Sequence, residues 1–93
     1  MNFEWDEAKS DACFRERGFD FAYVVRVFFD PDHVIRADMR RSYGESRYTL
    51  TGKIEHRLFV VAFTPRKDAI RIISARKANQ REVRCHENHP NED

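Results

Sequence analysis

The chain has 93 residues, of which 41% are hydrophobic and 35% are charged, and its formal net charge is +1. We expect a single domain over residues 1–93, and the large hydrophobic share excludes an intrinsically disordered protein. The charge is uneven, because residues 31–84 carry a net +7 between two ends that each carry −3; a basic central body of this kind suits a nucleic acid or an acidic protein partner.

The N-terminal third predicts a short strand followed by two helices. Phe3–Trp5 has strand character, and Asp6 is a good N-cap for a helix over Asp6–Arg17 that ends at Gly18. A second segment, Phe21–Phe28, carries apolar residues at helical spacing. Its valine content fits a strand as well, but we predict a helix.

The remainder of the chain predicts an antiparallel meander and a final helix. Strands are expected at His33–Ala37, Ser46–Lys53, Arg57–Thr64 and Ala69–Ala75, and a polar helix from about Lys77 to His89. The expected fold class is therefore α+β, with two N-terminal helices, an antiparallel sheet of about four strands and a C-terminal helix.

The segment from Arg71 to Glu82, RIISARKANQRE, changes from an apolar strand to a polar helix near Arg76. Arg71, Arg76 and Lys77 would gather where the strand leads into the helix, and three cations on rigid elements suit a phosphate chain. Alternatively, Arg71 pairs with a carboxylate across the sheet, and Arg76 only completes the first helical turn. Glu82 is expected to be structural, because six residues along one helix separate it from the face of Arg76.

Three blocks of the sequence resemble one known family. The first contains Phe3, Trp5, Asp6, Lys9 and Gly18, the second Asp38, Arg40, Gly44, Glu45 and Arg47, and the third is RIISARKA followed by Glu82. These blocks are similar to the FxWDxxK opening, the D-R-GE-R block and the C-terminal signature of the BrnT family. The similarity extends from about Phe3 to Glu82, which is nearly the whole chain.

The resemblance implies a function as well as a fold. BrnT proteins are the ribonuclease toxins of the BrnT/BrnA toxin–antitoxin pair, with a RelE-like fold. This chain would then be an endoribonuclease that inhibits translation, with RNA as substrate and a BrnA-like antitoxin as partner. It would contact DNA only indirectly, through the antitoxin complex.

Metal-free RNA cleavage requires a base for the 2′-hydroxyl, cations for the phosphorane and an acid for the leaving oxygen. The catalytic candidates are Arg71, Arg76, Glu45 and Arg47, and the substrate-binding candidates are Lys9, Arg40, Lys77 and Trp5. Plainer interpretations exist for several of them. Glu45 and Arg47 also fit a surface ion pair, Lys9 a solvated helix face, and Trp5 a position in the core.

No metal or cofactor is expected. Cys85, His86 and His89 lie close together in the sequence, but they lack paired cysteine spacing and a fourth ligand. The other cysteine, Cys13, is far away in the sequence, and no stretch resembles a signal peptide or a membrane span. These features predict a reducing, cytoplasmic location without a membrane partner.

A second interpretation is a binding module that keeps the fold and has lost the chemistry. Cys13 stands where the family often has Asn, and Arg17 where it often has His. Such a protein would serve as an antitoxin partner or co-repressor. Direct DNA binding is disfavoured, because the sequence shows no helix-turn-helix pattern.

Overall fold

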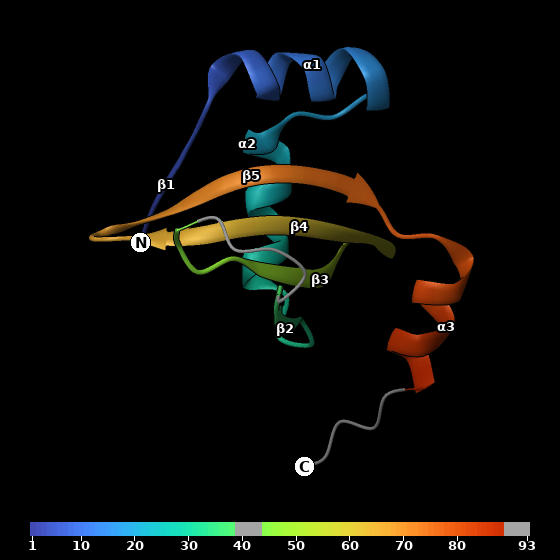
Figure 1. Ribbon diagram of the computed structural model, residues 1–93. Coiled ribbons are helices and arrows are strands. Elements are labelled where there is room, and N and C mark those ends of the chain that lie inside the picture. Colours follow the sequence, from blue (N-terminus) through green and yellow to red (C-terminus); the bar gives the residue numbers. More distant parts are fainter. Residues whose placement is uncertain (39–43, 89–93) are drawn as a thin grey trace.

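The structure, a computed structural model, describes residues 1–38 and 44–88 (Figure 1). It has an α+β fold in which one five-stranded sheet has the strand order β1-β5-β4-β3-β2. The elements in chain order are β1 (Asn2–Trp5), α1 (Glu7–Arg17), α2 (Phe21–Val24), the 3₁₀ helix η1 (Val25–Phe29), β2 (Val34–Ala37), β3 (Tyr48–Ile54), β4 (Arg57–Arg66), β5 (Ala69–Lys77) and α3 (Gln80–Asn88).

The sheet is mixed, and it contains one strand more than the expected four. The N-terminal strand β1 pairs in parallel with β5, so that Phe3 lies opposite Ile70 and Trp5 opposite Ile72. The other three strand pairs are antiparallel, as expected. The expectation of an antiparallel meander was therefore wrong at this edge, where the pairing partner lies at the other end of the chain.

The two N-terminal helical segments form as their end signals predict. The Asp6 carboxylate accepts hydrogen bonds from the amides of Ala8 and Lys9, and Gly18 ends α1 at a φ of 88°. The second helical segment is α-helical only in α2 and then tightens into η1. The prediction of a single regular helix over this segment was thus only partly correct. The second half, which is rich in valine and phenylalanine, forms a 3₁₀ helix instead.

The C-terminal boundary differs from the expectation. β5 continues to Lys77, because Ala75 and Lys77 pair with Val61 and Phe59 of β4, and α3 begins only at Gln80. Arg76 and Lys77 are therefore strand residues, and their predicted place in the first turn of a helix was wrong. The expected helix end at His89 lies outside the described residues.

The sheet has two different faces. One packs against α2 and η1, which lie behind it in Figure 1. The core between these layers consists of buried side chains from the helices and from alternate strand positions, among them Phe21, Val24, Val27, Leu50, Phe59, Val61 and Ile72. The strand register places a second set on the opposite side, which we call the open face: Thr49, Thr51, Val60, Ala62, Thr64, Arg71, Ser74 and Arg76.

Replacing Ser10 with Ala should destabilise the fold, because the buried Ser10 hydroxyl accepts the amide hydrogen of Phe21 at 3.0 Å. Without that acceptor, a buried N–H loses its partner, which costs about 1–3 kcal/mol. Urea unfolding measures the change. Ser74→Ala, at an exposed strand position, is the matched control; equal effects of the two substitutions would contradict the assigned role of Ser10.

Candidate functional site

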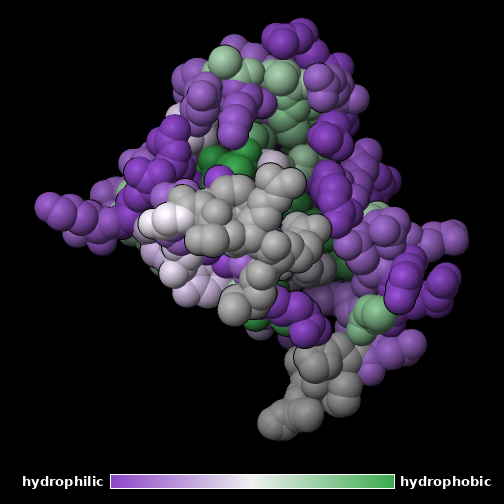
Figure 2. All heavy atoms as spheres, in the orientation of Figure 1, coloured by the Kyte–Doolittle hydropathy of each residue, from purple (hydrophilic) through white to green (hydrophobic). Residues whose placement is uncertain are grey.

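A groove of about 560 Å³ runs between the open face and α3. Its floor comes from β2, β3 and β4 through Val34, Thr49, Thr51 and Val60, and its charged walls include Arg36, Arg76, Arg81 and His86. The side of the molecule shown in Figure 2 is dominated by hydrophilic residues. The groove thus has half-exposed threonine and valine side chains at its base and arginines in its walls, and these arginines suit a negatively charged ligand.

Arg76 and Glu82 form the junction between β5 and α3. The Arg76 guanidinium donates through both terminal nitrogens to the two carboxylate oxygens of Glu82, each at 2.8 Å. Glu82 also accepts from the amide of Asn79, whose side chain accepts from the amide of Glu82. This is a capping box. The expectation that six helical residues separate Glu82 from Arg76 was wrong, because Arg76 belongs to the strand.

The same contact shifts two pKa values. The hydrogen bonds from Arg76 lower the pKa of Glu82 from 4.5 to about 2, against a smaller opposing effect of burial. Reciprocally, the hydrogen bond to Glu82 raises the pKa of Arg76. The pair therefore stays fully ionised at neutral pH, and Arg76 is held as a positioned cation at the end of the groove.

A second charged cluster lies at the opposite end of the open face. Arg71 pairs with Glu4 of β1 at 3.1 Å, which confirms the expected alternative of a carboxylate across the sheet. Nearby, the Thr64 hydroxyl donates to the carbonyl of Ser46, and Thr64 lies opposite Arg71 in the sheet. The hydrogen bond of Thr64 therefore brings the segment of residues 44–47 beside Arg71.

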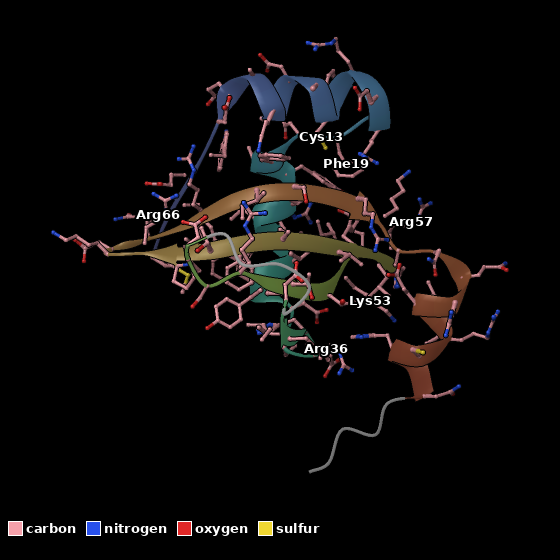
Figure 3. All side chains as sticks on the ribbon, viewed as in Figure 1. Cys13, Phe19, Arg36, Lys53, Arg57 and Arg66 are labelled. Carbon is pink, nitrogen blue, oxygen red and sulfur yellow. The ribbon has the colours of Figure 1, made fainter. Side chains whose placement is uncertain are left out.

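Glu45 lies between two arginines in this cluster. Its carboxylate is 3.3 Å from Arg66 and 3.9 Å from Arg47, and Figure 3 shows Arg66 at this end of the sheet. The ion pair that was the plainer interpretation of Glu45 and Arg47 is therefore present. Arg66 also contacts Glu45, so that three charged residues form one group. This group lies close to Arg71, because Thr64 lies opposite Arg71 and binds the segment that contains Glu45.

The two ends of the open face are separated by a floor of small side chains. Arg71 and Arg76 lie opposite Thr64 and Val60, which are four positions apart on β4 because β5 has a bulge between them. At about 3.3 Å per residue, their Cα atoms are about 13 Å apart. Ser74, Ala62 and Thr49 lie in register between them. Arg71 and Arg76 thus lie at opposite ends of this floor.

The four substrate-binding candidates are not brought together on this face. Lys77 alternates with Arg76 and points to the helix-covered side. Trp5 packs against the core with its ring at 6.5 Å from that of Phe21. Lys9 is exposed on α1, and no described contact joins it to the open face. Arg40 lies outside the described residues.

Sequence reasoning missed three arginines of these two clusters, Arg36, Arg66 and Arg81. Arg36 and Arg81 line the groove together with His86, and Arg66 contacts Glu45. Strand alternation could have predicted which side of the sheet Arg36 and Arg66 face. The locations of Arg81 and His86 are set by the position of α3. Within residues 1–38 and 44–88, no group of three or more His, Cys, Asp or Glu side chains is arranged to hold a metal ion. Nor does any described helix have the length and apolarity to cross a membrane.

Comparison with known families gives one match. The sequence model described as "Ribonuclease toxin, BrnT, of type II toxin-antitoxin system" matches residues 5–82, which is most of the chain. A search of curated proteins found no significant match. The matched range includes Glu45, Arg47, Arg71, Arg76 and Glu82, and the floor between the two charged clusters.

The Arg76–Glu82 contact makes the titration of Glu82 a direct test of this geometry. A lowered pKa in the folded state means that the pair stabilises the fold above pH 4.5 and that this contribution is lost as the pH falls towards 2. In Arg76→Ala, the pKa of Glu82 should rise towards 4.5, as followed by carboxyl carbon NMR. Arg36→Ala, in the same groove, is the control; a Glu82 pKa unaffected by loss of Arg76 would refute the pairing.

Proposed function

The chain belongs to the BrnT family of ribonuclease toxins of type II toxin–antitoxin systems, and we propose that it cleaves RNA on the open face of its sheet. The observation that carries this proposal is the shared side of Arg71, Arg76 and the Glu45–Arg47 group. They come from separate parts of the chain, yet strand register and the Thr64–Ser46 hydrogen bond place them on one surface.

In the proposed reaction, the 2′-hydroxyl of the RNA attacks the adjacent phosphorus, and Glu45 accepts its proton. Arg71 and Arg47 stabilise the charge on the pentavalent phosphorane. The bond from phosphorus to the 5′-oxygen breaks and that oxygen takes up a proton, which leaves a 2′,3′-cyclic phosphate and a 5′-hydroxyl. Arginines here provide the positive charge for which other nucleases use a metal ion, so the proposed mechanism is metal-independent.

Arg76 has a different role in this proposal. It lies about 13 Å along the strand from Arg71 by Cα rise, and Glu82 orients its guanidinium. It would bind a neighbouring phosphate and align the RNA over Ser74 and Ala62. Guanidinium groups have five N–H donors, so Arg76 has donors left for a phosphate beside those that Glu82 occupies.

A toxin of this class acts together with an antitoxin. We propose a BrnA-like protein for that role, with DNA contacted only through the complex, in the cytoplasm where RNA and ribosomes are available. The alternative of a binding module without chemistry rested on Cys13 and Arg17. Cys13 is a buried core residue under α1 (Figure 3), and Arg17 lies on the helix-covered side. Neither residue is part of the proposed RNA surface.

Arg71→Ala should lower the rate of RNA cleavage in EDTA by a factor on the order of 10²–10³, the loss typical when one preorganised transition-state donor is removed. Mapping the cut ends of a mixed RNA should show cyclic phosphates for the unchanged protein. Arg26→Ala is the matched control, because Arg26 also forms a surface ion pair, with Glu55 at 3.3 Å, on the other side of the sheet. Cleavage retained in Arg71→Ala would remove Arg71 from the site.

Raised salt should weaken RNA binding if phosphate contacts dominate it. The dissociation constant of a non-cleavable oligonucleotide, measured by fluorescence anisotropy, should rise with salt. Arg76→Ala should reduce the slope of the double-logarithmic plot by about 0.7, which is the contribution of one phosphate contact on a single strand. An unchanged slope would exclude Arg76 as a phosphate ligand.

A further inference from the structure

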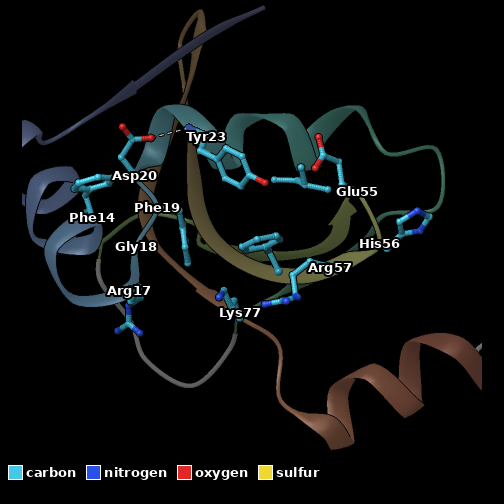
Figure 4. Close-up of a pocket in the computed structure, with 12 residues that line it drawn as sticks. Phe14, Arg17, Gly18, Phe19, Asp20, Tyr23, Glu55, His56, Arg57 and Lys77 are labelled. Carbon is cyan, nitrogen blue, oxygen red and sulfur yellow. Dashed lines mark hydrogen bonds between the residues drawn. The ribbon is translucent and has the colours of Figure 1, made fainter.

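A second pocket, of about 750 Å³, lies on the other side of the sheet from the proposed RNA site. Figure 4 shows that it is bounded by the end of α1, the start of α2, the β3–β4 turn and the end of β5. Cationic side chains reach it from three of these elements: Arg17, Arg57 and Lys77. The cleavage site proposed above uses none of these residues. Lys77 follows Arg76 in the sequence, but strand alternation directs it to this side of the sheet.

The charges of this pocket are unbalanced towards the positive. Among the described residues, no carboxylate forms an ion pair with Arg17, Arg57 or Lys77, in contrast to the arginines of the open face. The pocket also contains two carboxylates, but both are already engaged. Asp20 accepts the amide hydrogen of Tyr23 at the start of α2, and Glu55 pairs with Arg26 at 3.3 Å. The lining therefore has three cations and two carboxylates, a formal excess of one positive charge.

The pocket also has an apolar base. Phe19 and Phe59 contact one another edge to face, with ring centroids 5.1 Å apart, and Tyr23 lies 6.0 Å from Phe59. At the rim, Phe14 is 58% exposed, which makes it one of four large hydrophobic residues exposed in the described chain. Aromatic side chains beside arginine are the typical composition of an energetically important protein–protein contact.

The β3–β4 turn forms the rim with an unusual backbone. Glu55 and His56 have φ values of 49° and 75°, in a two-residue turn where glycine and asparagine are the preferred residues. Conformations of this kind are unfavourable for larger side chains and cluster at functional positions. The turn holds Arg57, the next residue, at the mouth of the pocket beside Lys77 (Figure 4).

We propose that this pocket docks an acidic segment of a protein partner that packs one aromatic or aliphatic side chain against the exposed ring of Phe14. The carboxylates of the segment would pair with Arg17, Arg57 and Lys77. The inference rests on the proposed function in one respect, because the antitoxin of the system is the partner that must present this segment.

The same features argue against RNA as the occupant. A base needs an exposed aromatic face on which to stack. Phe19 and Phe59 are buried, and the guanidinium of Arg26 lies over the ring of Tyr23 at 5.4 Å. Only Phe14 at the rim remains. An RNA strand on the open face would also have to pass around the end of the sheet to reach these cations.

The proposal is tested with three synthetic peptides, acetyl-Glu-Asp-Phe-Glu-Asp-amide, its analogue with serine in the centre, and its analogue with lysine at the four acidic positions. Amide NMR of the full chain locates binding. The acidic phenylalanine peptide should shift the amides of residues 17–23, 54–59 and 77 and leave those of Thr49, Ala62 and Ser74 unchanged. The serine and lysine peptides should bind more weakly by about tenfold or more.

Arg57→Glu should weaken the acidic phenylalanine peptide by about tenfold or more, because it places like charges together. Lys67→Glu makes the same charge change at the opposite end of β4 and should have no effect on the peptide. RNA cleavage by Arg57→Glu should be unchanged, so failure of the docking proposal is distinguishable from failure of the ribonuclease proposal. Equal binding of the serine peptide, or shifts at this pocket caused by oligouridylate in place of the peptide, would overturn the inference.

Discussion

The contact between Arg76 and Glu82 determines the shape of the open face, because it holds α3 in place. None of the described residues of α3 is buried, so this helix lacks the apolar packing that normally stabilises a short helix. Its attachment is polar, through the bidentate Arg76–Glu82 pair, the capping box with Asn79 and the hydrogen bond from Ala78 to the carbonyl of Leu58. The groove beside α3 exists only while these bonds are intact, and RNA binding at Arg76 would be coupled to the position of the helix.

Strand alternation then divides the basic residues between two surfaces. Arg76 and Lys77 are neighbours in the sequence, yet one faces the open side and the other faces the pocket under α1 and α2. On the open side the arginines are paired with Glu4, Glu45 and Glu82. Such pairs keep guanidinium groups oriented and limit their mutual repulsion. On the other side, three cations surround aromatic residues. Substrate and protein partner would therefore use different sides of one sheet.

Much of the fold could be predicted from local signals. Patterns within a few residues predict the start of α1 at Asp6 and its end at Gly18. Similar local patterns predict the two N-terminal helical segments and the four antiparallel strands. The parallel pairing of β1 with β5 could not, because it joins Phe3 and Ile70 through a contact that no local pattern encodes. The start of α3 could have been predicted from the capping signature of Asn79 and Glu82. The helix was instead predicted to begin near Arg76, because the sequence is polar from that residue onward.

The sequence indicated candidate residues for the site but not how they are arranged. The family blocks identified Glu45, Arg47, Arg71 and Arg76, and the strand register places their segments on one side. Lys77 was assigned to the same site because the strand boundary was predicted two residues too early, so the side of the sheet that Lys77 faces could not be predicted. Trp5 was a candidate through its place in the first family block, and its packing against Phe21 matches the plainer interpretation of a core position. A β-bulge at Ala62/Phe63 also shifts the pairing of β4 with β5 by one residue. No pattern in this sequence indicates that bulge.

The most direct test of the account is to locate bound RNA by amide NMR with an oligonucleotide made non-cleavable by 2′-O-methyl groups. The account predicts shifts at Thr49, Ala62, Ser74 and Arg76 on the open face, and none at Phe19, Phe59 and Lys77 on the opposite side. Shifts confined to the second set would contradict it, because RNA would then occupy the surface assigned to the protein partner.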